Sequence, residues 1–165
     1  MKILVLSDSH ASLSFMRLCL KLVQPDQVIH LGDHYEDGTA LAEENPHICF
    51  HQVPGNCDRF RCPPGLPEIL CYDIGGVRFY MTHGHKHNVK YDIGRLLADA
   101  HSCGAQAVLY GHTHQAQCDQ TDDGMWVLNP GSCGSYGGSV GVIRVEDKRI
   151  TACHILRQAE LDSLK

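Results

Sequence analysis

Polar side chains that can bind metals recur at five points of the 165-residue sequence, each where an apolar run ends, and four of the five points have a glycine beside them. The seven residues are Asp8, His10, Asp33, Asn56, His83, His112 and His114. Their carboxylate, imidazole and amide groups suit Mn²⁺, Fe, Ni²⁺ or Zn²⁺ better than Ca²⁺, which prefers oxygen ligands. Seven ligands are too many for one catalytic ion that keeps open positions. They indicate two ions that share a carboxylate, about 3.5–4 Å apart.

Each of these residues also has an ordinary structural explanation. Aspartate and asparagine favour strand ends and helix caps, so one of them alone would indicate a turn. The seven together favour metal binding.

The other histidines are interpreted one by one. We expect His30, inside an apolar run, to be a core residue with satisfied hydrogen bonds. His34, His85 and His87 lie beside predicted ligands and could line a substrate pocket or form its polar rim. We interpret the four other histidines outside the predicted ligand set as core or surface residues: His47, His51, His101 and His154.

The apolar runs that carry the polar residues are typical of buried strands. Strands are expected at Lys2–Leu6, Gln27–Leu31, Ile48–Val53, Ile69–Ile74, Val77–Thr82 and Ala105–Tyr110, with Gly75-Gly76 forming a hairpin. Helices are expected between them. One is capped by Ser12 and stopped by Pro25, one covers Thr39–Glu44, and one buries Ile93, Leu96, Leu97 and Ala100.

The second half of the chain has the pattern of antiparallel strands: Gln115–Asp119, Met125–Leu128, Val140–Val145 and Arg149–Leu156. Alternating strands and helices in the first half imply right-handed parallel connections. We therefore predict an α/β (α+β) fold in which two mixed β-sheets pack as a sandwich with helices on the outer faces, in four αββα layers. We expect residues 1–165 to form a single domain.

Composition excludes several classes of protein. The chain is 43% hydrophobic and 20% charged, an ordinary globular balance, and its net charge of −5 comes without any cluster of lysine and arginine. Nucleic acid is therefore not an expected partner, because phosphate contacts require a basic face. None of the nine cysteines forms a Cys-x-x-Cys pair, so a disulfide framework is not expected. With no signal peptide or membrane span, we predict a cytoplasmic protein.

Five motifs resemble, in order, the sequence blocks of the calcineurin-like metallophosphoesterases. They are Asp8-x-His10, Gly32-Asp33, Gly55-Asn56-x-Asp58, His83-Gly84-His85 and Gly111-His112-Thr113-His114. The short chain, Asn56-Cys57-Asp58 and the closing Asn129-Pro130-Gly131-Ser132 are most similar to the small stand-alone phosphodiesterase branch. The vacuolar-sorting subunit of retromer is a related but divergent scaffold.

The resemblance implies a role for each residue. Asp8, His10, Asp33 and His114 would hold the first metal, and Asp33, Asn56, His83 and His112 the second, with Asp33 as the bridge. The ions would be Mn²⁺, or alternatively Fe, Ni²⁺ or Zn²⁺. Water between them, as a bridging hydroxide, would be the nucleophile, since bound metal lowers its pKa from 15.7 to about 7. Asp58 would orient the Asn56 loop, and His85 could line the substrate pocket; we count both as candidate catalytic residues.

The sequence departs from the family pattern at two places. Strong phosphatases of the family often carry a histidine after the asparagine as a general acid, whereas here the residue is Cys57. The loop after Ser132 often carries a basic residue, and residues 133–138 contain none. Arg59 is a loose substitute. These departures affect which substrates are expected. They do not change the prediction of metal binding.

The resulting functional hypothesis is two-metal hydrolysis of small phosphate esters, with phosphodiesters as the favoured substrates. One alternative is a nuclease, which the missing basic surface disfavours. The other is a non-enzymatic protein-interaction scaffold on the same fold, which would be free to lose ligands that this chain retains. The sequence is compatible with a homo-oligomer and leaves the oligomeric state open.

Overall fold

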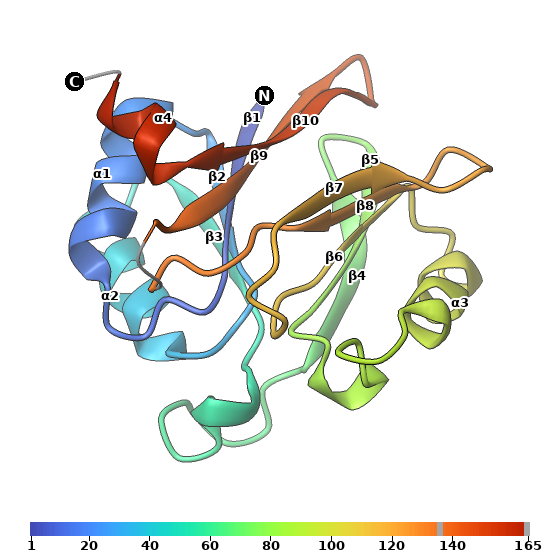
Figure 1. The fold of residues 1–165 in the computed structure, drawn as a ribbon, viewed down its shortest axis with the longest axis horizontal. Coiled ribbons are helices and arrows are strands. Elements are labelled where there is room, and N and C mark those ends of the chain that lie inside the picture. Colours follow the sequence, from blue (N-terminus) through green and yellow to red (C-terminus); the bar gives the residue numbers. More distant parts are fainter. Residues whose placement is uncertain (135–136, 164–165) are drawn as a thin grey trace.

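Two five-stranded sheets form the centre of the computed structural model, which describes residues 1–134 and 137–163 (Figure 1). In the first sheet the strand order is β10 (Arg149–Arg157), β9 (Ser139–Glu146), β1 (Lys2–Leu6), β2 (Gln27–His30) and β3 (Cys49–Gln52). In the second it is β4 (Ile69–Ile74), β5 (Val77–Thr82), β6 (Ala107–Leu109), β8 (Trp126–Asn129) and β7 (Gln117–Gln120). Both sheets mix parallel and antiparallel pairs, as predicted.

Helices cover the outer faces of the sheets. They are α1 (Leu13–Val23), α2 (Tyr35–Glu44), α3 (Gly94–Ser102) and α4 (Gln158–Asp162), and two 3₁₀ turns occupy Asn56–Asp58 and His85–His87. Helices α1, α2 and α4 lie beside the first sheet, and α3 lies beside the second (Figure 1). A shared apolar core, including Val5, Ile29, Phe79 and Leu109, fills the space between the sheets. The predicted four-layer sandwich is confirmed.

Local sequence signals located most elements well. The β4–β5 hairpin has the predicted bounds, because Gly75 and Gly76 supply two consecutive positive φ angles. Helix α1 ends at Val23 as expected, and Gln24 closes it in a left-handed conformation. Ser12 stands at the N-cap position, but its side chain makes no capping hydrogen bond, so that detail of the prediction is wrong.

Three expectations about the elements are corrected. Strand β8 pairs antiparallel with β7 but parallel with β6, so the second half is not wholly antiparallel. Helix α2 begins at Tyr35, four residues before the predicted start. Helix α4 was not predicted at all.

One pair of cysteines is bonded, although the sequence predicts no disulfide framework. Cys71 of β4 and Cys103, which follows α3, form a disulfide, because the end of α3 packs beside the second sheet. Seven cysteines are free, in agreement with the absence of a disulfide framework. Among the described residues, no helix is long and apolar enough to cross a membrane. The cytoplasmic location stays a prediction.

Candidate metal centre

All seven predicted ligands lie just beyond the carboxyl ends of five strands. Asp8 and His10 follow β1, Asp33 follows β2 and Asn56 follows β3 in the first sheet. In the second sheet His83 follows β5, and the pair His112 and His114 follows β6. Parallel strands deliver their carboxyl ends to one edge, where open α/β sheets bind ligands. The sandwich places the two edges together, and side chains 104 residues apart come into contact there.

The backbone at these ligands is held in an unusual conformation. Five of the seven residues have positive φ although they are not glycine: Asp8 (53°), His10 (43°), Asp33 (57°), His112 (68°) and His114 (59°). Such conformations are uncommon outside glycine, and they cluster where function requires them. The left-handed turns redirect each side chain from the strand axis toward the shared site.

Close approach of the loops explains the glycines that accompany the ligands. A Cβ atom on Gly32 would lie 2.5 Å from the backbone nitrogen of Gly55, so the loops of Asp33 and Asn56 touch through backbone. A Cβ atom on Gly111 would lie 2.0 Å from Ser7 Oγ and 2.9 Å from Asp8 Oδ2. Side chains at these positions would push the ligand loops apart.

A buried set of side chains that could bind a metal forms the inner half of the site. Asp8, Asp33 and His83 offer ligand atoms within 4.8 Å of one another. His83 Nε2 lies 3.5 Å from Asp33 Oδ1, 4.0 Å from Asp8 Oδ1 and 3.1 Å from the amide oxygen of Asn56. All three partner atoms are oxygens that can act as acceptors.

The orientation of the His83 ring makes this arrangement fit a cation. His83 Nδ1 lies 2.8 Å from the carbonyl oxygen of Leu31, which can only accept, so Nδ1 donates its proton there and Nε2 is the nitrogen left to bind a metal. Nε2 converges with the oxygens of Asp8, Asp33 and Asn56. Asp8 Oδ1 is buried and makes no hydrogen bond, although His114 Nε2 lies 3.1 Å from it. A buried polar atom without a partner destabilises the folded protein. A metal ion bound here would be coordinated by these oxygen and nitrogen atoms together.

A more exposed set forms the outer half of the site. Asp8, His10 and His114 also bring their ligand atoms within 4.8 Å of one another. His114 Nε2 lies 3.1 Å from Asp8 Oδ1 and 3.4 Å from His10 Nε2. The two sets share Asp8, whereas Asp33 belongs to the buried set. The predicted bridging role of Asp33 therefore stays a prediction.

The surroundings of two predicted ligands, Asp33 and His112, favour the protonation states that bind metals. Burial raises the pKa of Asp33, but His83 and the Cys57 N–H, which donates to Asp33 Oδ1 at 2.8 Å, outweigh it and lower the pKa overall. Burial, with smaller contributions from His83 and Lys90, lowers the pKa of His112 to about 4. At neutral pH Asp33 is thus a carboxylate and His112 offers a lone pair.

Asp58 holds the loops of the first sheet together. Its carboxylate is fully buried and accepts backbone N–H bonds from Asp33 (2.9 Å), His34 (2.7 Å), Tyr35 (2.9 Å) and Gly55 (2.7 Å). Asp58 belongs to neither set of converging ligand atoms. The structure therefore places this candidate catalytic residue behind the site, where it positions the loops of Asp33 and Asn56.

Replacing Asp58 by asparagine is expected to lower the free energy of unfolding by about 3 kcal/mol or more, because charged acceptors are lost and buried N–H groups face an amide. Urea unfolding of the metal-free protein measures the change. Asp122→Asn, in an exposed turn, is the matched control and should shift stability by less than about 0.5 kcal/mol. Equal unfolding midpoints for Asp58→Asn and wild type would contradict the positioning role.

The histidines near the ligands have different surroundings. His85 lies beside His83, with ring centroids 5.5 Å apart, and its buried Nδ1 has no partner. His34 packs edge-on against His10 at 5.3 Å. His87 is buried and contacts the Tyr80 hydroxyl at 3.1 Å, which makes it a structural residue. His30 is a satisfied core histidine, as predicted, with Ser9 Oγ at 3.2 Å from its Nε2.

Two residues near the site were missed from the sequence. Ser7 Oγ donates to Asp8 Oδ2 at 2.5 Å and is buried, so it orients the carboxylate. Lys90 acts electrostatically on His112. The position of Ser7 beside a predicted ligand was a usable signal, whereas nothing in the sequence places Lys90 near the site.

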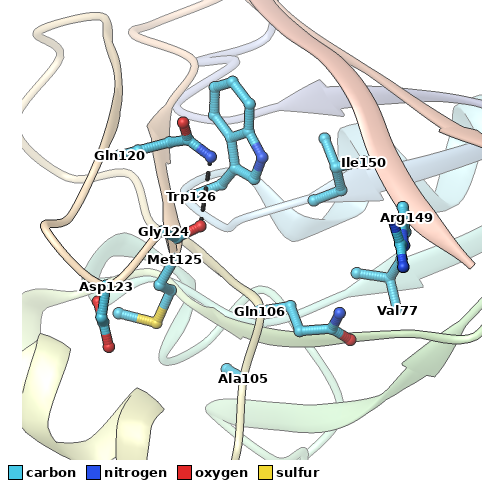
Figure 2. A pocket seen from close by; sticks show the side chains of 10 residues that line it. All are labelled: Val77, Ala105, Gln106, Gln120, Asp123, Gly124, Met125, Trp126, Arg149 and Ile150. Atoms are coloured by element: carbon cyan, nitrogen blue, oxygen red, sulfur yellow. Dashed lines mark hydrogen bonds between the residues drawn. The ribbon is translucent and has the colours of Figure 1, made fainter.

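A hollow of about 390 Å³ lies elsewhere, between the start of β10 and the ends of β5, β7 and β8 (Figure 2). Trp126, Arg149, Ile150 and Gln106 are among its lining residues, and the Gln120 amide donates to the Gly124 carbonyl beside it. It contains none of the seven predicted ligands. This hollow is therefore not part of the candidate metal centre.

Comparison with known proteins gives a family match over most of the chain. The model of the calcineurin-like phosphoesterase superfamily domain matches residues 1–148. A Mycoplasma pneumoniae protein named "Probable metallophosphoesterase" is 34% identical over 134 residues, covering 79% of this chain and 78% of that protein. A phosphodiesterase of Methanocaldococcus jannaschii is 28% identical over 162 residues, covering 89% and 93%.

Solved structures share the fold. The crystal structure of wild-type Vps29 from Entamoeba histolytica, complexed with Zn²⁺, superposes with a TM-score of 0.73 at 21% identity. The match covers 95% of this chain and 98% of that one. At this identity the likeness establishes the arrangement of the elements and nothing further.

Proposed function

Because the chain belongs to the calcineurin-like phosphoesterase superfamily and is therefore a metal-dependent phosphate-ester hydrolase, we propose that it cleaves phosphodiesters with two divalent ions. The observation that supports this proposal is the convergence of His83 Nε2 with oxygens of Asp8, Asp33 and Asn56. When bound, the ions would supply a water nucleophile of lowered pKa and would stabilise negative charge on the phosphoryl oxygens.

The residues of the chain would divide the remaining work. Asp8, His10, Asp33 and His114 would hold one ion, and Asp33, Asn56, His83 and His112 the other. The Leu31 carbonyl fixes the ring of His83, and Asp58 fixes the loops that carry Asp33 and Asn56. We propose Mn²⁺ as the metal.

A second group of residues would meet the substrate. His85 lines a hollow of about 510 Å³ together with Asn56, Arg59 and Lys86. Arg59 and Lys86 bring positive charge to this hollow, although the Lys86 ammonium pairs with Glu68 at 2.7 Å. We propose that His85 contacts the bound phosphate ester from this hollow.

Turnover of bis-p-nitrophenyl phosphate tests the proposal. The metal-free protein would be given Mn²⁺, Fe²⁺, Ni²⁺ or Zn²⁺ in turn, and plasmid DNA would be included as a separate substrate. We expect turnover of the small diester and intact plasmid. Metal binding without turnover of any ester would favour the scaffold alternative, and plasmid cleavage would favour the nuclease.

Hydrolysis is expected to depend steeply on the leaving group, because position 57 carries a thiol in place of imidazole. General acid help is typically worth about 10²–10⁴-fold, and a thiol is a poor donor by comparison. The rates of p-nitrophenyl, phenyl and alkyl diesters should fall with rising leaving-group pKa.

Cys57→Ser should change this dependence little, and Cys62→Ser is the matched control from the same loop. If wild type gave a flat line that steepened in Cys57→Ser, Cys57 would itself be the acid.

A further inference from the structure

Two hollows lie along the segment that follows β5, and each includes a residue from a loop that carries predicted ligands, Thr113 in one and Asn56 in the other. The first, the Tyr91 hollow, measures about 770 Å³ and is lined by Val89–Ile93 and by the loop around Thr113, which stands between the predicted ligands His112 and His114. The second is the 510 Å³ hollow of Asn56 and His85. Residues 85–86 line the second and residues 89–93 the first, so the segment after β5 separates them.

The Tyr91 hollow has an exposed aromatic wall. Tyr91 is 92% exposed, and the other large apolar side chains exposed in the described part of the chain are Phe60 and Ile69. Val89 and Ile93 extend the apolar surface on the same segment. Gln115, in the facing loop, and Gln117, the first residue of β7, bring amide groups, and the Gln117 amide already bonds Tyr110 and Asp119. A planar group with polar edges could stack on Tyr91 and reach these amides.

Lys90 brings a positive charge to this hollow, which it lines together with Thr113 between the predicted ligands His112 and His114. Asp92 also lines the hollow, and its Oδ1 accepts the Gly94 N–H at 2.7 Å. Within residues 1–134 and 137–163, no carboxylate forms an ion pair with Lys90. An ammonium group without a protein partner beside a predicted metal ligand is suited to an anion bound at the metals.

We propose that the substrate is a phosphodiester with one planar aromatic arm, which stacks on Tyr91 in the Tyr91 hollow while Lys90 contacts the phosphate. This inference rests on the proposed function and specifies its substrate class. A phosphodiester has two arms, and a hollow lies on each side of the dividing segment. The aromatic group would be either a simple aryl group or a nucleobase.

Binding of three phosphate monoesters to the Mn²⁺-loaded protein tests the aromatic arm without a leaving group. The ligands are methyl phosphate, phenyl phosphate and adenosine 5′-monophosphate, measured by calorimetry. We expect the two aromatic ligands to bind about 10-fold more tightly than methyl phosphate, the range of one stacking contact. Tighter binding of the nucleotide than of phenyl phosphate would identify a nucleobase, and equal binding an aryl group; both support the proposal.

Three variants assign the effect to named side chains. Tyr91→Ala should remove most of the aromatic preference and leave methyl phosphate binding unchanged, and Tyr91→Phe should retain the preference. Lys90→Gln should weaken the binding of all three ligands several-fold. Lys21→Ala, on α1 at a separate hollow, should leave their binding unchanged. Equal binding of the three ligands to wild type, or an aromatic preference that survives in Tyr91→Ala, would overturn the proposal.

Turnover of methyl p-nitrophenyl phosphate distinguishes failure of the proposed aromatic arm from failure of the proposed function. If that diester is hydrolysed while the monoesters bind equally, the proposed function holds and the aromatic arm is wrong. If no diester is hydrolysed with any metal, the proposed function itself fails.

Discussion

Removal of bound metal is expected to reduce phosphodiester hydrolysis to the uncatalysed rate. The described side chains at the site offer no better nucleophile than metal-activated water: Ser7 is fully buried and donates its hydroxyl proton to Asp8, and Cys57 has no base beside it other than the ligand Asp33. The measurement is turnover of bis-p-nitrophenyl phosphate after dialysis against a chelator, with metal content determined on the same sample.

Two controls make this result decisive. Stoichiometric Mn²⁺ should restore activity, which excludes denaturation by the chelator. Cys57→Ser should lose activity on chelation just as wild type does, which excludes a thiol nucleophile. Turnover that persists in a sample shown to contain no metal would mean that the mechanism is wrong.

Local signals predicted the elements well where the neighbours in the sequence determine the structure. The hairpin at Gly75-Gly76 is closed by residues that adopt positive φ easily, and no distant contact is needed. The start of α2 was missed because it depends on a distant residue. Asp58, 23 residues further along the chain, accepts the N–H groups of His34 and Tyr35 and allows the helix to begin there.

Pairing between strands was harder to predict for the same reason. The apolar run that forms β8 gives no indication that its neighbour in the sheet is β6 as well as β7. Its parallel partner is chosen by the packing of the whole second sheet. A period-two pattern predicts a strand, but it does not identify the partner or the direction.

The candidate site also has features that the sequence predicts and features that depend on the fold. The seven predicted ligands could be selected because each stands at a strand end. The structure brings five of them into two clusters of converging atoms and places Asn56 and His112 beside His83. Their arrangement into a buried and an exposed set could not be predicted, because left-handed turns at five of the ligands redirect the side chains. Lys90 and Tyr91 were also missed, since only the fold brings their segment beside the loop of His112 and His114.

Replacing Asp33 by alanine is expected to be far more damaging than replacing His10. Asp33 is almost fully buried, faces His83 Nε2 at 3.5 Å and is the predicted bridge between the ions, whereas His10 is exposed and would serve one ion. Loss of the bridge should lower metal content at both positions. Activity should fall by about 10³-fold or more, since each ion supplies several kcal/mol of transition-state stabilisation.

Metal content of three variants decides between Asp33 and Asp8 as the shared ligand. If Asp33 bridges, Asp33→Ala should retain less than one ion per chain and His10→Ala about one. Asp33→Asn keeps the side-chain oxygen that accepts the Cys57 N–H, so it separates loss of the charge from collapse of the loop. Asp8 belongs to both sets of converging donors, so Asp8→Ala is the direct rival. Two ions retained in Asp33→Ala but lost in Asp8→Ala would transfer the bridging role to Asp8, because only the shared carboxylate can empty both positions when it is removed.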